Sequence, residues 1–250
     1  MAELDPVAEA IGSAMLSQRV RATTVALRRR LAGLVQAHRR DDVRRVRQGR
    51  HLAYRQLYRL PCRASGIFVK KTRRPAPDTA VYLLLDRSGS MTGARIRVAS
   101  EATLATALAL AEIPGCQTAV LAFPGSTEQR VIPLLGFTEQ AKTVAGRFRL
   151  VAQGSTPMAN ALWRAAYELL LRPETRRLLV VITDGKPNNP QATAEIIQRC
   201  RRSGIEVFGL GIEFDEPVKV LFGAPSAVSI ENIQDLPKAL FQLLERGLLG

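Results

Sequence analysis

The hydrophobic and polar positions after residue 78 follow two alternating patterns. Unbroken apolar runs of strand length are separated by helix-length segments, and such runs are typical of strands buried on both faces of a parallel sheet. The runs predict strands over residues 80–85, 118–123, 129–135, 178–183, 205–212 and 227–230. Helices are expected over 94–112, 138–151, 157–171, 191–203 and from about residue 234. This order predicts an α/β protein with a doubly wound, mainly parallel six-stranded sheet and helices on both faces.

The first 77 residues follow a different pattern. Apolar residues recur at helical spacing after Thr23 or Thr24, and residues 41–49 and 52–60 are predicted to continue as short helical pieces. Residues 67–69 favour a short strand, and the prolines of residues 73–77 indicate a linker. We therefore predict a small, mainly helical N-terminal segment at residues 1–77 and an α/β domain at residues 78–250.

Charge separates the same two regions. Residues 1–78 hold 18 Lys or Arg and 6 Asp or Glu, a net charge of +12, which leaves +2 for the rest of a chain whose total is +14. Such an asymmetry is compatible with binding to nucleic acid, to a membrane or to an acidic protein surface. The candidate docking residues of the basic segment are Arg28, Arg29, Arg44, Arg45 and Arg47.

The sequence also bears on the compartment. The longest apolar stretch, residues 102–111, is about half of the ~20 residues that a membrane span needs, and the first residues lack the pattern of a secretory signal. The three cysteines lie far apart, without a CxxC pair, which argues against a disulfide framework. We expect a cytoplasmic protein with no membrane association.

Candidate chemistry lies in the loops that follow the predicted strands, where α/β sheets bind ligands. The first strand is followed by Asp86, Ser88 and Ser90, which share one side of an extended segment. Thr156 precedes a helix, and Asp184 follows the fourth strand. Two carboxylates and three hydroxyls form an all-oxygen set that suits Mg²⁺, with Mn²⁺ or Ca²⁺ as alternatives.

Three further residues lie next to this set in the sequence. Gly89 would permit the turn between the two serines, and Asn160 lies one helical turn beyond Thr156. Lys186 could steer an acidic ligand toward the site. Arg87 is expected to point away from the metal and to lie at the surface.

The motifs D-x-S-x-S, G-S-T-P and T-D-G, each placed after a predicted strand or before a helix, resemble the metal-ion-dependent adhesion site (MIDAS) of von Willebrand factor A (VWA) domains. The resemblance covers residues 78–250 and implies that the five residues above bind the metal. It also implies an antiparallel strand at 129–135 and central first and fourth strands. Within this family the chain most resembles bacterial CobT-like proteins, whose relatives act beside MoxR-type AAA+ ATPases.

Several enzyme classes lack their motifs. The sequence contains no G-x-x-x-x-G-K-[ST] loop for ATP, no G-x-S-x-G elbow and no third glycine after Gly209 and Gly211 for a dinucleotide. Both histidines lie in the basic segment, away from the serines. We therefore expect a protein that is not an enzyme by itself, although metal-assisted phosphoester chemistry remains an alternative.

The expected function is a metal-dependent protein-binding adaptor. A Mg²⁺ held at the site would accept an acidic side chain of a client, and the resemblance implies a separate MoxR-type AAA+ ATPase as a second partner. Two alternatives stay open: a cobalt-chelatase-like subunit, and nucleic-acid binding through the basic segment.

Overall fold

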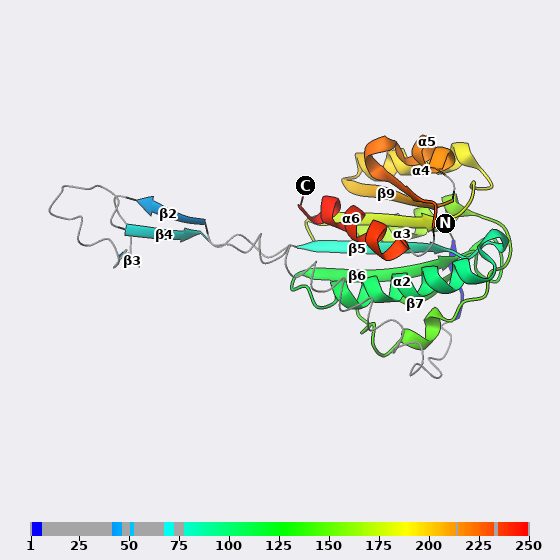
Figure 1. Ribbon diagram of the computed structural model, residues 1–250, viewed down its shortest axis with the longest axis horizontal. Helices are drawn as coiled ribbons and strands as arrows, with labels where there is room; N and C mark the ends of the chain where they lie inside the picture. The colour runs from blue at the N-terminus through cyan, green and yellow to red at the C-terminus, as the bar shows by residue number, and fades with distance from the viewer. Residues whose placement is uncertain are drawn as a thin grey trace.

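A computed structural model of the chain describes residues 2–6, 42–46, 51–52, 68–72, 78–213, 215–232 and 235–249. A seven-stranded sheet forms the centre of the main body (Figure 1). Its order is β1 (Glu3–Leu4), β7 (Arg130–Leu135), β6 (Cys116–Phe123), β5 (Thr79–Asp86), β8 (Arg176–Thr183), β9 (Ile205–Ile212) and β10 (Ala227–Ile230). β7 runs antiparallel to β6, and β1 runs parallel to β7, so these two strands oppose the other five.

Five α-helices of the described part of the chain cover the two faces of this sheet. α2 (Ala94–Leu110) and α6 (Leu236–Leu249) pack on one face, as Figure 1 shows. The other face is covered by α3 (Met158–Leu170), α4 (Pro190–Arg202) and α5 (Asp215–Phe222). Short 3-10 turns lie at η2 (Gly89–Met91), η3 (Ala145–Phe148) and η4 (Ala224–Ser226).

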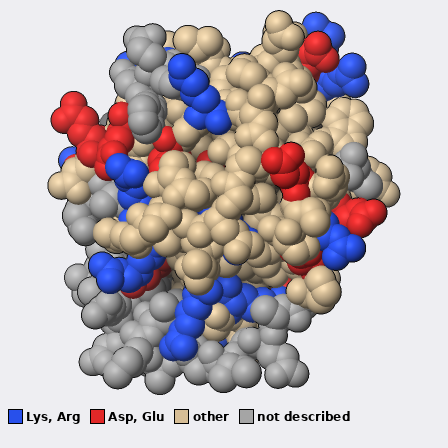
Figure 2. Space-filling model, turned by 90° about the vertical axis from the view of Figure 1, so that its right-hand side faces the viewer, with Lys and Arg blue, Asp and Glu red and all other residues tan. Residues whose placement is uncertain are grey.

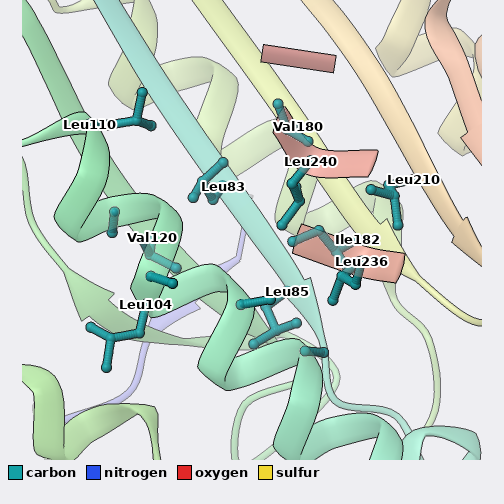
Figure 3. Packing of buried hydrophobic residues seen from close by; sticks show 14 of the residues in the cluster. Leu83, Leu85, Leu104, Leu110, Val120, Val180, Ile182, Leu210, Leu236 and Leu240 are labelled. Atoms are coloured by element: carbon teal, nitrogen blue, oxygen red, sulfur yellow. The ribbon is translucent and has the colours of Figure 1, made fainter. Parts of the chain in front are cut away.

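The central strand β5 contributes to both layers of the core. Leu83 and Leu85 join the cluster that α2 and α6 complete, shown in Figure 3, whereas Tyr82 and Leu84 face α3. Every residue of β5 is buried. Because successive side chains point to opposite faces and both faces are covered, the stretch from Ala80 to Leu85 is apolar, and the polar residues Thr79 and Asp86 lie at the two ends of the strand.

The predicted fold class is confirmed, with β7 antiparallel and β5 and β8 in the centre of the sheet. The number of strands is corrected from six to seven, because β1 pairs with the outer edge of β7. Residues 3–4 therefore belong to the main sheet rather than to the basic segment. Two residues are too short a run for a hydrophobic pattern to reveal a strand.

The helix predicted over residues 138–151 is wrong, because this stretch forms turns and the short η3. Polar side chains bond to nearby backbone there: Glu139 Oε2 accepts from the N–H of Gly136, and Thr143 Oγ1 donates to the carbonyl of Gln140. Such local bonds compete with the hydrogen bonds of a helix.

The helix α5 is absent from the sequence-based prediction. Its Pro217 lies in the first turn, where proline is tolerated.

A second, three-stranded antiparallel sheet of order β2-β4-β3 is formed by β2 (Asp42–Val46), β4 (Phe68–Thr72) and β3 (His51–Leu52). The strand predicted at 67–69 is confirmed as part of β4, but the helix predicted at 41–49 is wrong, because residues 42–46 pair with β4. Pairing with a segment about 25 residues away leaves no mark on local periodicity. Arg44 and Arg45 lie in β2.

The remaining predictions for the basic segment lie outside the described residues. They include Arg28, Arg29 and Arg47, the helix after Thr23 and the linker at 73–77. The boundary between residues 77 and 78 stays a prediction. Within the described part of the chain, no helix has both the length and the apolarity needed to cross a membrane.

Gly209 of β9 allows α5 to approach the sheet. A Cβ at this position would lie 2.6 Å from Cγ of Phe222, whose ring is fully buried. We predict that Gly209→Ala lowers the free energy of unfolding by about 1–3 kcal/mol, because the ring has no room to retreat. Denaturant unfolding measures this loss, and Gly209→Ala with Phe222→Leu should recover part of it; equal losses in both proteins would contradict the contact.

Candidate metal centre

The in-register pairing of two central strands brings the first carboxylate against a buried hydroxyl. Leu85 of β5 pairs with Ile182 of β8, so Asp86 and Thr183 end neighbouring strands at the same edge. Thr183 Oγ1 donates a hydrogen bond of 2.5 Å to Asp86 Oδ2. Both residues are fully buried. Asp86 is therefore held in one orientation by a residue that sequence reasoning did not single out.

A chain of hydrogen bonds joins four of the five predicted ligands. The N–H of Ser88 donates to Asp86 Oδ1 at 2.8 Å, and the hydroxyls of Ser88 and Ser90 lie 3.0 Å apart. Ser90 Oγ then donates to Asp184 Oδ1 at 2.7 Å. Asp86 before the turn, the two serines of that turn and Asp184 after β8 thus hold their oxygens close to one another.

Thr156 reaches the same region through backbone contacts of its loop. The N–H of Gly89 donates to the carbonyl of Gly154 at 2.9 Å, which ties the loop after β5 to the loop before α3. Asn188 holds Thr156 from the other side: its Oδ1 accepts from the N–H of Thr156 at 2.9 Å, and its own N–H donates to the Thr156 carbonyl at 3.0 Å. Asn188 is a second positioning residue that the sequence analysis missed.

The glycine that needs its conformational freedom is Gly154 rather than Gly89. Gly154 has φ 76°, and a Cβ there would lie 3.0 Å from Cγ of Pro124. Gly89 does not have a positive φ. A Cβ on it would lie 3.5 Å from the carbonyl oxygen of Gly154, an ordinary van der Waals contact. The expected special turn at Gly89 is thus corrected: the left-handed position lies in the G-S-T-P element.

Burial of the two carboxylates disfavours their charged forms. Desolvation raises the pKa of Asp86 from 3.8 to about 6, against the lowering effect of its hydrogen bonds from Thr183 and Ser88. Desolvation also raises the pKa of Asp184, although Ser90 and Arg95 oppose it. The site therefore contains two negative charges that the fold stabilises only in part.

Arg95 of α2 is the cation nearest to these carboxylates. Its Nη1 donates to the carbonyl of Ser90 at 3.0 Å and lies 3.9 Å from Asp184 Oδ2. The same guanidinium pairs with Glu213, which follows β9. Sequence reasoning missed Arg95 because it lies inside a helix, outside the recognised motifs. Arg95 is therefore shared between Glu213 and Asp184, and its contact with Asp184 is a long ion pair without a hydrogen bond.

The residues present fit a divalent cation. Asp184 Oδ2 is buried and accepts no hydrogen bond, an arrangement that is costly unless a cation or a bound water satisfies the oxygen. All five predicted ligands offer oxygen, and the two carboxylates balance a charge of +2. Nowhere in the described chain do three or more His, Cys, Asp or Glu side chains gather as a metal cluster, so hydroxyls have to supply part of any coordination shell.

The other predicted neighbours lie at the rim. Asn160 Nδ2 donates to the carbonyl of Glu128 at 3.4 Å, and Lys186 is exposed after β8. The carboxylate of Glu128 accepts from Ser155 Oγ and from Asn188 Nδ2, so the loop before β7 closes one side of the site. Figure 2 shows this edge of the sheet: acidic and basic side chains surround a broad uncharged area.

Arg87 differs from its predicted surface role. It points away from the carboxylates, as expected, but it is buried. Its guanidinium donates to the carbonyls of Pro124 at 2.7 Å, Val151 at 3.1 Å and Gly125 at 3.2 Å. These three hydrogen bonds connect the D-x-S-x-S element to two other loops. Arg87 therefore stabilises the conformation of the loops around the site without contacting the carboxylates.

We predict that Thr183→Val weakens Mg²⁺ binding about tenfold, because Asp86 loses the hydroxyl that orients it and hydrogen bonds to charged groups contribute about 1.5–3 kcal/mol. Competition against bound Mn²⁺, followed by electron paramagnetic resonance, measures the change. Thr106→Val is the matched control, since its buried hydroxyl donates only to the Ala102 carbonyl within α2. Equal Mg²⁺ affinities in the two variants would refute the orienting role.

The raised pKa of Asp86 predicts a pH-dependent response to Mg²⁺. Without metal, the contribution of this carboxyl to stability is complete below 3.8 and is lost as pH rises through about 6. Mg²⁺ should therefore raise the melting temperature by a few degrees at about pH 7.5 and much less at about pH 5, where a proton occupies Asp86. Calorimetry at both pH values measures this, and a pH-independent increment would contradict it.

Comparison with known proteins identifies a family for this fold and site. The model of the von Willebrand factor type A domain matches residues 80–236. The magnesium-chelatase 67 kDa subunit of Chlorobaculum parvum is 32% identical over 127 residues, which are 50% of this chain and 20% of the relative. Protein NorD of Brucella suis is 29% identical over 189 residues, 68% of this chain and 30% of the relative. The chain thus spans less than a third of either relative.

A solved structure of similar fold is proximal thread matrix protein 1 from the mussel byssus with a zinc-occupied MIDAS motif. It superposes with a TM-score of 0.55 at 15% identity, covering 68% of this chain and 46% of the other. At this identity the likeness concerns the fold. The family match over more than half of the sequence and the seven-stranded α/β sheet agree, and the chain belongs to the von Willebrand factor type A domain family.

Proposed function

We propose that this protein is a metal-dependent protein-binding adaptor. Asp86, Ser88, Ser90, Thr156 and Asp184 would hold Mg²⁺, and an acidic side chain of a partner would complete its coordination. The observation that carries the proposal is the buried Asp184 Oδ2, which lacks a hydrogen-bond partner at the end of a chain of hydrogen-bonded oxygens. The bound cation would supply a positive charge that attracts a carboxylate.

The protein's own residues prepare this contact in three ways. Thr183 and the N–H of Ser88 fix both oxygens of Asp86, and Asn188 fixes the loop of Thr156. The ion pair with Glu213 keeps Arg95 beside the site. The surrounding surface carries charges of both signs (Figure 2), so attraction of an acidic ligand would come from the cation itself rather than from a broad positive field.

The kind of assembly is inferred from the relatives. Two of them are named as a magnesium-chelatase subunit and as protein NorD, and the CobT-like resemblance of the motifs implies a MoxR-type AAA+ ATPase as partner. We infer that this chain is a non-catalytic subunit that couples such an ATPase to an acidic client. A role as a cobalt-chelatase-like subunit is the narrower form of the same proposal.

Nucleic-acid binding through the basic segment is the second candidate, favoured by the net charge of +12 within residues 1–78. It would depend on phosphate contacts and would weaken steeply with salt. Charge reversal of Arg44 and Arg45 in β2 would reduce such binding, whereas it would leave a metal-dependent contact at Asp184 intact.

We predict that Asp184→Asn lowers Mn²⁺ and Mg²⁺ affinity more than tenfold, because the amide removes a charge and the free acceptor at once. Titration of the full chain, followed by electron paramagnetic resonance, measures it. Asp78→Asn provides the control: it is the same substitution at an exposed carboxylate just before β5, at the opposite edge of the sheet. Unchanged affinity in Asp184→Asn would overturn the metal site.

The adaptor role needs a second measurement. Wild type, Asp184→Asn and Asp78→Asn are immobilised and exposed to native cytosol with Mg²⁺ or with EDTA, and captured proteins are quantified by mass spectrometry. We expect at least one partner to be lost both in EDTA and in Asp184→Asn but retained by Asp78→Asn. The same proteins in every condition would show that the metal site does not bind partners.

A further inference from the structure

The outer side of α3 carries an exposed apolar stripe that the core does not use. Among the described residues, seven large apolar side chains are exposed, and four of them belong to this helix and its end: Trp163 (39%), Tyr167 (48%), Leu170 (47%) and Leu171 (68%). Spacings of four and three residues place Trp163, Tyr167 and Leu170 on one face, and Leu171 follows at the end of the helix. The face toward the sheet is filled separately, by residues such as Leu162 and Leu169. α3 thus has two apolar faces, and no described element covers the outer one.

A groove runs beside this stripe, between α3 and α4. Trp163, Tyr167 and Leu170 form one wall, and Arg199, Arg202 and Ser203 form the other. Its floor consists of buried small and apolar residues, Ala166, Cys200 and Ile205. The cavity measures about 360 Å³, within the range of about 300–1,000 Å³ that is typical of ligand sites. The groove can therefore accept a few apolar side chains.

The groove lies away from the candidate metal centre. α3 begins next to Thr156 at the carboxyl edge and runs back to the amino edge, where β8 starts at Arg176. Ile205, at the floor, is the first residue of β9 and lies at that amino edge. An occupant of this groove would leave the metal-binding edge free, so one domain could hold two partners at once.

The charge of the groove is positive and uncompensated. Arg199 lies with its guanidinium carbon 5.8 Å from the centroid of the Trp163 ring, and Arg202 is exposed. Neither forms an ion pair with a described residue, whereas the neighbouring Arg201 is engaged with the carbonyls of Val207 and Phe222. Among the described residues, no acidic side chain lines the groove. Apolar anchors next to two guanidinium groups without a described ion-pair partner complement an occupant that is apolar on one face and acidic beside it.

We propose that this groove, defined by Trp163, Tyr167, Leu170, Arg199 and Arg202, binds an acidic amphipathic helix of a partner protein. Apolar residues of the helix, spaced at i, i+3 or i+4 and i+7, lie on the α3 stripe, and its flanking Glu or Asp side chains pair with the two arginines. A second copy of this chain is a poor occupant, because its net charge of +14 opposes a basic groove. This binding is independent of the metal.

Trp163 provides a direct readout, since it is the only tryptophan of the chain. The probe is a synthetic amphipathic peptide of about 18 residues, or five helical turns, with Leu on one face and Glu beside it; a twin peptide carries Lys in place of Glu. We expect the Glu peptide to shift the Trp163 emission to the blue and to saturate, and the Lys peptide to leave it unchanged. Equal binding of both peptides would overturn the proposal.

Charge reversal tests the position of the site. Arg199→Glu with Arg202→Glu should weaken the Glu peptide at least about tenfold, because two rim contacts become repulsive. The matched control is Lys142→Glu with Arg149→Glu, an equal change of charge at exposed residues on the α2 side of the sheet, which should leave affinity unchanged. Equal weakening in both double variants would refute a specific groove.

Three other outcomes would also overturn the proposal. Loss of peptide binding in EDTA or in Asp184→Asn would place the peptide at the metal centre. A concentration-dependent emission shift without peptide, accompanied by dimers in sedimentation, would assign the groove to a second copy. Emission that is already blue-shifted and insensitive to peptide would show that the groove is covered within the chain.

Discussion

The burial of a carboxylate at the end of the central strand is the constraint on which the rest of this structure depends. Asp86 ends β5, between two parallel neighbours, and has no exposed surface. A buried charge is costly unless hydrogen bonds and opposite charge compensate it. Thr183 and the N–H of Ser88 supply the hydrogen bonds, and Asp184 adds a second buried negative charge through the two serines. A divalent cation would supply the positive charge that these two buried carboxylates still lack.

Several loops are shaped by this requirement. Arg87 fastens the loop after β5 to carbonyls of two other loops, and the backbone bond from Gly89 to Gly154 ties it to the residue before Ser155. Asn188 holds Thr156 at the same edge. These contacts join four separate chain segments, so the geometry of the oxygens is fixed by the packed sheet rather than by any one loop.

The two ends of the sheet have different physical characters. The carboxyl edge presents oxygens and one buried acceptor without a partner, an arrangement suited to a hard cation. The amino edge, beside α3 and α4, presents aromatic and aliphatic side chains next to Arg199 and Arg202. Because α3 connects the two edges, it begins beside the metal loop and ends at the apolar groove. If both proposals hold, the domain would bind one partner at each end of α3.

The sequence by itself determined the α/β class and the order of most elements, because continuous apolar runs reflect burial directly. It also predicted the five residues that we propose as metal ligands, from polar residues placed at the ends of those runs. It could not reveal β1, β2 or the loss of the helix at 138–151, since pairing with distant strands and side-chain bonds to the backbone leave no periodic signal. Thr183, Asn188 and Arg95 became visible only when the tertiary structure brought distant segments together, because their roles depend on contacts across the sheet edge.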